Sequence, residues 1–184
     1  TARHAWTGSR YIDILAPRPE DFVLEEIAVG LSREQRFGAA ATSIFWSVAQ
    51  HSLLALTMAE QDGMSELSLR AVLMHDAPEY VLRDLVRPVK AYCGEYRRIE
   101  QTWWEAIAAR FGLPQDQGPV VRHYDNLALA VEKAALVSPS AGPWDGVGEV
   151  LSGGIPKNLL DMTPVEAEKE FLRQASRIGL TRRG

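Results

Sequence analysis

Two adjacent residues, His75 and Asp76, are of the types used in metal and acid–base chemistry, and they end a strongly apolar segment. Leu69, Val72 and Leu73 predict that this segment is a helix with one buried face. Asp76 follows Val72 by one helical turn, so its carboxylate is expected on that face. Burying a carboxylate is costly unless it is paired or binds a metal. For such a pair standing alone, a hydrogen-bonded core position is the simpler interpretation.

The residues that follow this pair favour a catalytic interpretation. Two more carboxylates and two cations come next, with apolar residues between them: Glu79, Asp84, Arg87 and Lys90. Hydrolysis of a phosphate ester uses this mixture, because a metal generates hydroxide, a carboxylate handles the proton and cations hold the phosphate. This stretch therefore indicates a candidate site for that reaction.

Helices must position these residues, because apolar side chains recur at the 3.6-residue spacing through most of the chain. The pattern predicts helices over residues 20–31, 47–61, 65–76, 95–111, 119–137 and 163–179. Ser47 and Gln50 have the spacing of a capping box at the start of the second helix, and Thr163 and Glu166 repeat it at the start of the last. Pro78 is expected to end or kink the third helix, because it lacks a backbone donor and disfavours helical geometry before it.

The connections between these helices are short except for one. A turn is expected at residues 36–38, a short helix or turn through residues 87–88, and a short strand at residues 11–15. Residues 138–160 are predicted to form a long loop, because Gly, Ser and Pro are frequent in their first part. We expect one all-α domain over residues 1–184, a bundle of about six to seven helices with its core at about residues 20–137.

Composition and charge argue against several classes of function. The 184-residue chain has a net charge of −4, whereas a dedicated nucleic-acid binder normally carries a basic excess. No apolar run reaches the roughly 20 residues that a membrane span needs, and the first residues lack a signal-peptide pattern. Cys93 is the only cysteine, so no intramolecular disulfide can form and a cytoplasmic location is expected.

Five stretches of the chain carry a recognisable combination of motifs. They are RFG at residues 36–38, SVAQHS at 47–52, LMHDAPE at 73–79, DLVRPVK at 84–90 and RHYD at 122–125. In this order they resemble the HD-domain phosphohydrolases, and most closely the small bacterial and phage nucleotidases that act on deoxynucleotides. The resemblance covers roughly residues 8–136 and implies a single HD-type domain with an all-α fold, in agreement with the helix pattern.

The resemblance also implies one divalent transition-metal ion, with Co, Mn, Zn, Fe and Ni all open. Its ligands would be two imidazoles and two carboxylates: His51, His75, Asp76 and Asp125. Such a set suits a divalent ion and leaves coordination positions for water and phosphate. Glu79 matches the carboxylate that orients or deprotonates the attacking water, and Asp84 matches a second carboxylate of the site.

Substrate contacts are implied as well. Arg36 matches a phosphate-binding arginine, whose planar fork can meet two phosphate oxygens. Phe37 takes the aromatic position beside it, where some relatives have a Trp, so base and sugar preference does not transfer directly. Lys90 and Arg122 resemble further phosphate contacts.

The expected activity is hydrolysis of a small-molecule nucleotide, with a deoxynucleotide favoured. Either a monophosphate is cleaved to nucleoside and phosphate, or a triphosphate, which would bring additional Mg²⁺, is cleaved to nucleoside and triphosphate. The alternatives are hydrolysis of a cyclic or hyperphosphorylated signalling nucleotide, a non-catalytic nucleotide or metal sensor, and a structural metal.

Expected partners follow from the same sources. Neither a nucleic-acid polymer nor a membrane is expected, and the family resemblance implies a homo-oligomer, either a dimer or larger. Trp103 and Trp104 lie in the amphipathic segment 95–111, which predicts one of them in the core and the other at a subunit contact.

Overall fold

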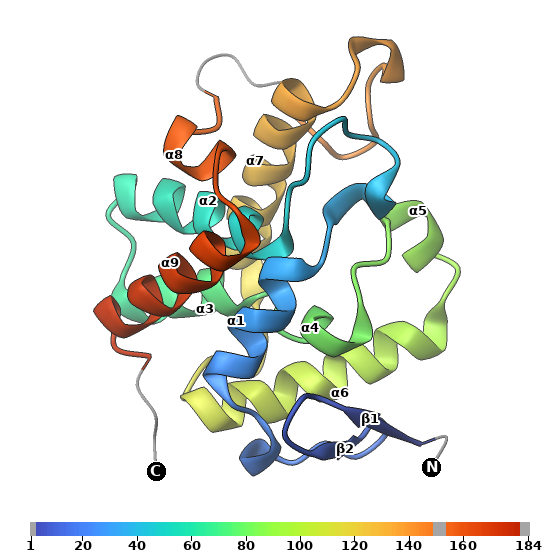
Figure 1. Cartoon of the computed structure of the whole chain (residues 1–184), viewed down its shortest axis with the longest axis vertical. Coiled ribbons are helices and arrows are strands. Elements are labelled where there is room, and N and C mark those ends of the chain that lie inside the picture. Colours follow the sequence, from blue (N-terminus) through green and yellow to red (C-terminus); the bar gives the residue numbers. More distant parts are fainter. Residues whose placement is uncertain (1–2, 149–153, 181–184) are drawn as a thin grey trace.

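Helices account for most of the chain (Figure 1). The computed structural model describes residues 3–148 and 154–180. Within these ranges, six helices have nine or more residues: α1 (Leu24–Arg33), α2 (Val48–Gln61), α3 (Glu66–Met74), α6 (Gly94–Phe111), α7 (Gly118–Leu136) and α9 (Pro164–Arg177). Three more in the same ranges have four residues each: α4 (Glu79–Leu82), α5 (Arg87–Lys90) and α8 (Lys157–Leu160). The predicted all-α fold is confirmed. No helix in the described ranges is both long and apolar enough to cross a membrane.

The helix-end signals in the sequence work as predicted. At the start of α2, the Oγ of Ser47 accepts a hydrogen bond from the backbone N of Gln50 at 3.2 Å, and the Oε1 of Gln50 accepts one from the backbone N of Ser47 at 2.9 Å. Thr163 and Glu166 form the same reciprocal pair at the start of α9. Pro78 separates α3 from α4. The ends of these helices are therefore fixed by local chemistry.

The first predicted helix, over residues 20–31, begins later than its sequence pattern indicates. A short 3-10 helix, Pro19–Asp21, comes first, and α1 begins only at Leu24. Between them, Phe22 and Val23 have extended backbone angles. The acidic residues near Glu20 thus belong to the 3-10 turn and to the first turn of α1, rather than to one continuous helix.

Two other segments also differ from the prediction. The segment 138–160 contains α8 and a 3-10 helix, Pro139–Ala141, while residues 149–153 lie outside the described ranges. The strand expected at residues 11–15 is β2 (Tyr11–Asp13), which pairs antiparallel with β1 (His4–Trp6). The sequence pattern did not predict β1.

The apolar core lies between the long helices. α2 packs against α3 and α7, and α1 packs against α2, α4 and α9. Trp46, Trp103 and Trp104 are among the largest fully buried side chains. The expectation that Trp103 or Trp104 lies at a subunit contact is wrong, because both are buried. Their Nε1 atoms donate to the backbone oxygens of Ile14 at 2.9 Å and Gln115 at 3.1 Å, respectively.

Two features of this packing bring distant segments to one place. A Cβ at Gly30 would lie 2.7 Å from the Cβ of Tyr80, so glycine allows α1 to approach α4 closely. This contact fixes the start of α4, which carries Glu79. The backbone N of Arg36 donates to the backbone O of Trp46 at 2.9 Å, which holds the turn at residues 36–39 beside the start of α2.

Candidate metal centre

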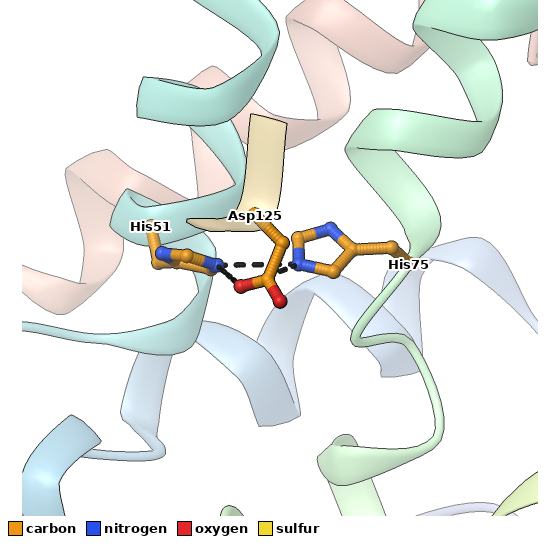
Figure 2. A group of neighbouring side chains, drawn as sticks. All are labelled: His51, His75 and Asp125. Atoms are coloured by element: carbon orange, nitrogen blue, oxygen red, sulfur yellow. Dashed lines mark hydrogen bonds and ion pairs between the residues drawn. The ribbon is translucent and has the colours of Figure 1, made fainter. Parts of the chain in front are cut away.

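Three side chains from three helices converge on one point (Figure 2): His51 from α2, His75 at the end of α3 and Asp125 from α7. The Nε2 atoms of the two histidines are 3.2 Å apart. Asp125 Oδ1 lies 3.2 Å from Nε2 of His51 and 3.8 Å from Nε2 of His75. Donor atoms about 2.1 Å from a shared ion lie roughly 3.0–3.4 Å from one another. The spacing is therefore one that a single metal ion could bridge.

The hydrogen bonds behind the histidines fix which nitrogen faces this point. Nδ1 of His51 is 2.6 Å from Oε1 of Glu132, and Nδ1 of His75 is 2.7 Å from the backbone O of Val72. A carboxylate and a carbonyl can only accept, so each Nδ1 carries a proton. In the neutral imidazoles each Nε2 then has a free lone pair, and two such lone pairs face a carboxylate oxygen. This arrangement favours a cation at their centre.

Asp76 reaches the same point from the end of α3. Its Oδ2 lies 3.2 Å from Nε2 of His75 and 3.6 Å from Nε2 of His51. Because α3 ends at Met74, two consecutive side chains can turn toward one place, which a continuing helix would not allow. The structure thus brings three of the four suggested ligands, His51, His75 and Asp125, to one point, and it places Asp76 beside the two histidines.

The charges at this point shift the pKa values of His75, Asp76 and Asp125 strongly. Burial lowers the pKa of His75, but the charges of Asp76 and Asp125 outweigh it and raise the pKa well above its usual value. Burial raises the pKa of Asp125, but its interactions with His51 and His75 outweigh it and lower the pKa. Asp76 behaves in the same way, with His75 as the main cause of a lowered pKa. A metal ion would therefore compete with protons for the histidines.

Glu79 is the next buried carboxylate, at the start of α4. Its Oε2 is buried and has no hydrogen-bond partner within the described chain, while Oε1 lies 3.7 Å from Nζ of Lys90. Burial, reinforced by the charges of Asp76 and Asp84, raises the pKa of Glu79 well above its usual value. Burial also raises the pKa of Asp84. Both predicted carboxylates are thus close enough to the candidate ligands to respond to the charge of Asp76.

The predicted cations differ in their surroundings. Arg36 is buried, with Nε 3.1 Å from Glu132 Oε2 and Nη1 3.4 Å from Asp76 Oδ2. Lys90 lies between two carboxylates, because its Nζ is also 2.5 Å from Oε1 of Glu100. Arg122 is exposed, and within the described ranges no ion pair links it to the other predicted residues.

Phe37 lies beside Arg36 in a strained turn. Its backbone has φ 61° and ψ 25°, in the left-handed region that costs a residue with a Cβ roughly 1–2 kcal/mol. Its ring centroid is 6.0 Å from that of Trp144 and 5.6 Å from Cζ of Arg36. The aromatic position that the sequence suggested is therefore next to the buried arginine and to the segment after Ala141. Strain of this kind is common near functional sites.

The four converging side chains differ in how far solvent reaches them. Their exposed fractions rise in the order His51 0%, His75 4%, Asp76 17% and Asp125 27%. The site is therefore open on the Asp125 side and closed behind His51. Arg87 lies on the open side, with Nη2 2.9 Å from Oδ2 of Asp125 and a side chain that is 48% exposed.

Sequence reasoning missed two residues that hold this centre. Glu132 is completely buried and accepts hydrogen bonds from His51, Arg36 and Trp46. It follows Asp125 by two helical turns in α7, so a carboxylate on the same face as Asp125 was the available signal. Gln117 donates from Nε2 to the backbone O of His75 at 2.6 Å, and no sequence signal pointed to it.

Comparison with known proteins places the chain in a family. No family model matches it. An uncharacterized protein of Rhodobacter capsulatus is 40% identical over 119 residues, so the match spans 61% of each chain. The uncharacterized protein YfdR of Escherichia coli K12 is 33% identical over 159 residues, which are 84% of this chain and 83% of YfdR. The chain therefore belongs to the same protein family as YfdR.

Proposed function

We propose that this protein is a metal-dependent phosphohydrolase of the HD kind that cleaves a phosphate ester of a nucleotide. The observation that carries the proposal is the convergence of His51, His75 and Asp125, with Asp76 beside the two histidines. Four acceptor groups meet there, and the buried Glu79 lies near them with one oxygen unpaired. When bound there, a divalent ion would supply Lewis acidity and lower the pKa of a coordinated water.

Glu79 is suited to handle the proton of the attacking water. Its free Oε2 can accept a hydrogen bond, while Lys90 stands 3.7 Å from the other oxygen. The pKa of Glu79 is raised toward neutral pH, and a group whose pKa lies near the working pH can both take up and release a proton. In this proposal Glu79 orients the water and receives its proton.

Arg36 is suited to hold the phosphate. Its Nε donates to Glu132 and its Nη1 donates to Asp76, whereas its Nη2 forms no hydrogen bond within the described chain. A guanidinium fixed on one side offers a preorganised donor on the other. Arg87, on the open side of the centre, would meet a phosphate that approaches from solvent.

The balance of charge favours a monophosphate as the substrate. Three cations among the described residues, Arg36, Arg87 and Lys90, contact the carboxylates of this region. Against them stand six carboxylates: Asp76, Glu79, Asp84, Glu100, Asp125 and Glu132. Even with a divalent ion, the positive charges do not exceed the negative ones. A triphosphate carries more negative charge than a monophosphate, which has about −2 at neutral pH. The deoxyribose preference rests on the family resemblance alone.

A hydrolysis screen tests the proposal. Protein loaded with Mn²⁺ or Co²⁺ is incubated with ribo- and deoxynucleoside mono- and triphosphates, and the products are separated by chromatography. We expect inorganic phosphate from deoxynucleoside monophosphates, and its loss in Asp76→Asn but not in Asp161→Asn, a matched change at an exposed aspartate. Release of triphosphate would instead favour cleavage of a nucleoside triphosphate to nucleoside and triphosphate. Metal binding without any hydrolysis would support a sensor or a structural metal.

A further inference from the structure

Glu132 is a completely buried carboxylate whose two oxygens face three donors. Oε1 accepts from Nδ1 of His51 at 2.6 Å and from Nε1 of Trp46 at 2.9 Å. Oε2 accepts from Nε of Arg36 at 3.1 Å. A buried carboxylate is costly unless it is neutralised and hydrogen-bonded, so these donors account for its ionised state. Although burial raises the pKa of Glu132, the charge of Arg36 and the bonds from His51 and Trp46 outweigh it and lower the pKa.

Two of these donors belong to different parts of the proposed machinery. His51 is a candidate metal ligand, and Arg36 is the proposed phosphate-binding residue. We propose that Glu132 is a positioning residue that sets His51 and Arg36 relative to each other, so that metal binding and phosphate binding both depend on this one side chain. The inference rests on the proposed function for the role of Arg36.

The effect on His51 follows from its hydrogen bond. The bond from Nδ1 to Glu132 keeps the proton on Nδ1, turns Nε2 toward His75 and Asp125, and raises the basicity of Nε2. Without this bond the imidazole could rotate or carry its proton on Nε2. No second acceptor could hold the imidazole in the same orientation, because His51 is fully buried and its Nδ1 has no other acceptor among the described residues.

The effect on Arg36 follows from its ion pair. Of the two carboxylates that hold Arg36, Glu132 is nearer at 3.1 Å, whereas Asp76 lies 3.4 Å away and is itself a candidate metal ligand. A bound ion would withdraw charge from Asp76, which leaves Glu132 as the main partner of Arg36. Glu132 therefore fixes the direction in which the free Nη2 points.

Glu132→Gln tests this role with little change in volume. A glutamine side chain has one oxygen and one NH₂ group in place of the two oxygens. The NH₂ group must therefore face donors, either the Nε of Arg36 on one side or the His51 and Trp46 nitrogens on the other. Trp46→Phe is the matched control, because it removes one donor from the same carboxylate and leaves the bonds to His51 and Arg36. Glu132→Asp restores the charge on a shorter side chain.

Two affinities and a spectrum decide the outcome. Co²⁺ affinity is measured by competition with a chelator, the visible spectrum of the bound Co²⁺ reports its coordination, and calorimetry gives the affinity of the Co²⁺-loaded protein for inorganic phosphate. We expect Glu132→Gln to lose about 10–100-fold in Co²⁺ affinity, to alter the spectrum and to weaken phosphate binding. Trp46→Phe should keep all three, and Glu132→Asp should lie between Glu132→Gln and the wild type.

The results separate the failure of this inference from that of the proposed function. If Glu132→Gln matches Trp46→Phe in both affinities, Glu132 is only structural and the inference is overturned. If Glu132→Gln does not fold, Glu132→Asp must bind Co²⁺ more weakly than Trp46→Phe, and equal affinities would overturn the inference. Wild-type protein that binds neither Co²⁺ nor phosphate would overturn the proposed function together with it.

Discussion

Replacing Glu79 by Gln should change activity and stability in opposite directions. Glu79 is buried, with one oxygen unpaired and only Lys90, 3.7 Å away, to offset its charge. If it takes the proton of the attacking water, Glu79→Gln should lower kcat about 10²–10⁴-fold while the metal stays bound. The same change removes a buried negative charge, so the metal-free protein should gain about 1 kcal/mol of stability, the lower end of the cost of an unsatisfied buried group. For a chain of this size, that is a rise in Tm of about 2–4 °C.

The pH dependence of this gain has a definite sign. Because the pKa of Glu79 is raised in the folded state, its contribution to stability is fully present below its unfolded pKa of about 4.3 and is lost as pH rises through the folded value. The Tm advantage of metal-free Glu79→Gln over wild type should therefore grow as pH rises. The test is thermal unfolding, monitored by fluorescence, at a series of pH values from about 4.3 upward. The kcat is measured separately, from the release of phosphate. Glu105→Gln, at an exposed glutamate of α6, should change neither quantity. Unchanged kcat together with unchanged or lower Tm would refute the assignment of Glu79.

Three further perturbations test other parts of the structure. Asp76→Asn should abolish the stabilisation by added metal, which in wild type is about 2.7 kcal/mol when free metal is 100 times Kd; a metal-induced rise in Tm in the variant would remove Asp76 from the ligands. Arg87→Gln should raise KM for the nucleotide more than it lowers kcat, whereas Arg122→Gln should leave both unchanged in steady-state assays; equal effects would contradict the placement of Arg87 on the open side. Gly30→Ala should destabilise the protein by about 1–3 kcal/mol in denaturant unfolding, because the added Cβ would lie 2.7 Å from the Cβ of Tyr80. Wild-type stability in Gly30→Ala would show that α1 and α4 can separate at no cost.

The parts of the fold that could be predicted from sequence depend on local chemistry. Ser47 and Thr163 begin helices through hydrogen bonds to residues three positions away, and Pro78, which lacks a backbone donor, lies between α3 and α4. The start of α1 was harder, because the acidic residues near Glu20 suit a 3-10 turn as well as a helix. The pattern did not predict that both tryptophans are buried, because the burial of Trp104 depends on the segment that follows α6, where the backbone O of Gln115 accepts its Nε1–H.

The residues of the site also differ in whether the sequence could predict them. The motifs around His51, His75 and Asp125 were visible in the sequence, and the structure brings these residues together. For Glu132 the sequence offered only its position on the same helix face as Asp125, because its hydrogen-bond partners lie 81 to 96 positions earlier in the chain. A carboxylate in a long helix is usually solvated, and only the packing of α7 against α2 shows that this one is buried.

The most direct test of a metal-dependent phosphohydrolase is a titration of metal-stripped protein with Co²⁺, with release of phosphate from a deoxynucleoside monophosphate measured at each step. We predict no release without metal and a rate that rises in proportion to bound Co²⁺ until one ion is bound per chain. Activity that is independent of metal, or one tightly bound ion per chain with no hydrolysis of any nucleotide, would contradict the proposal.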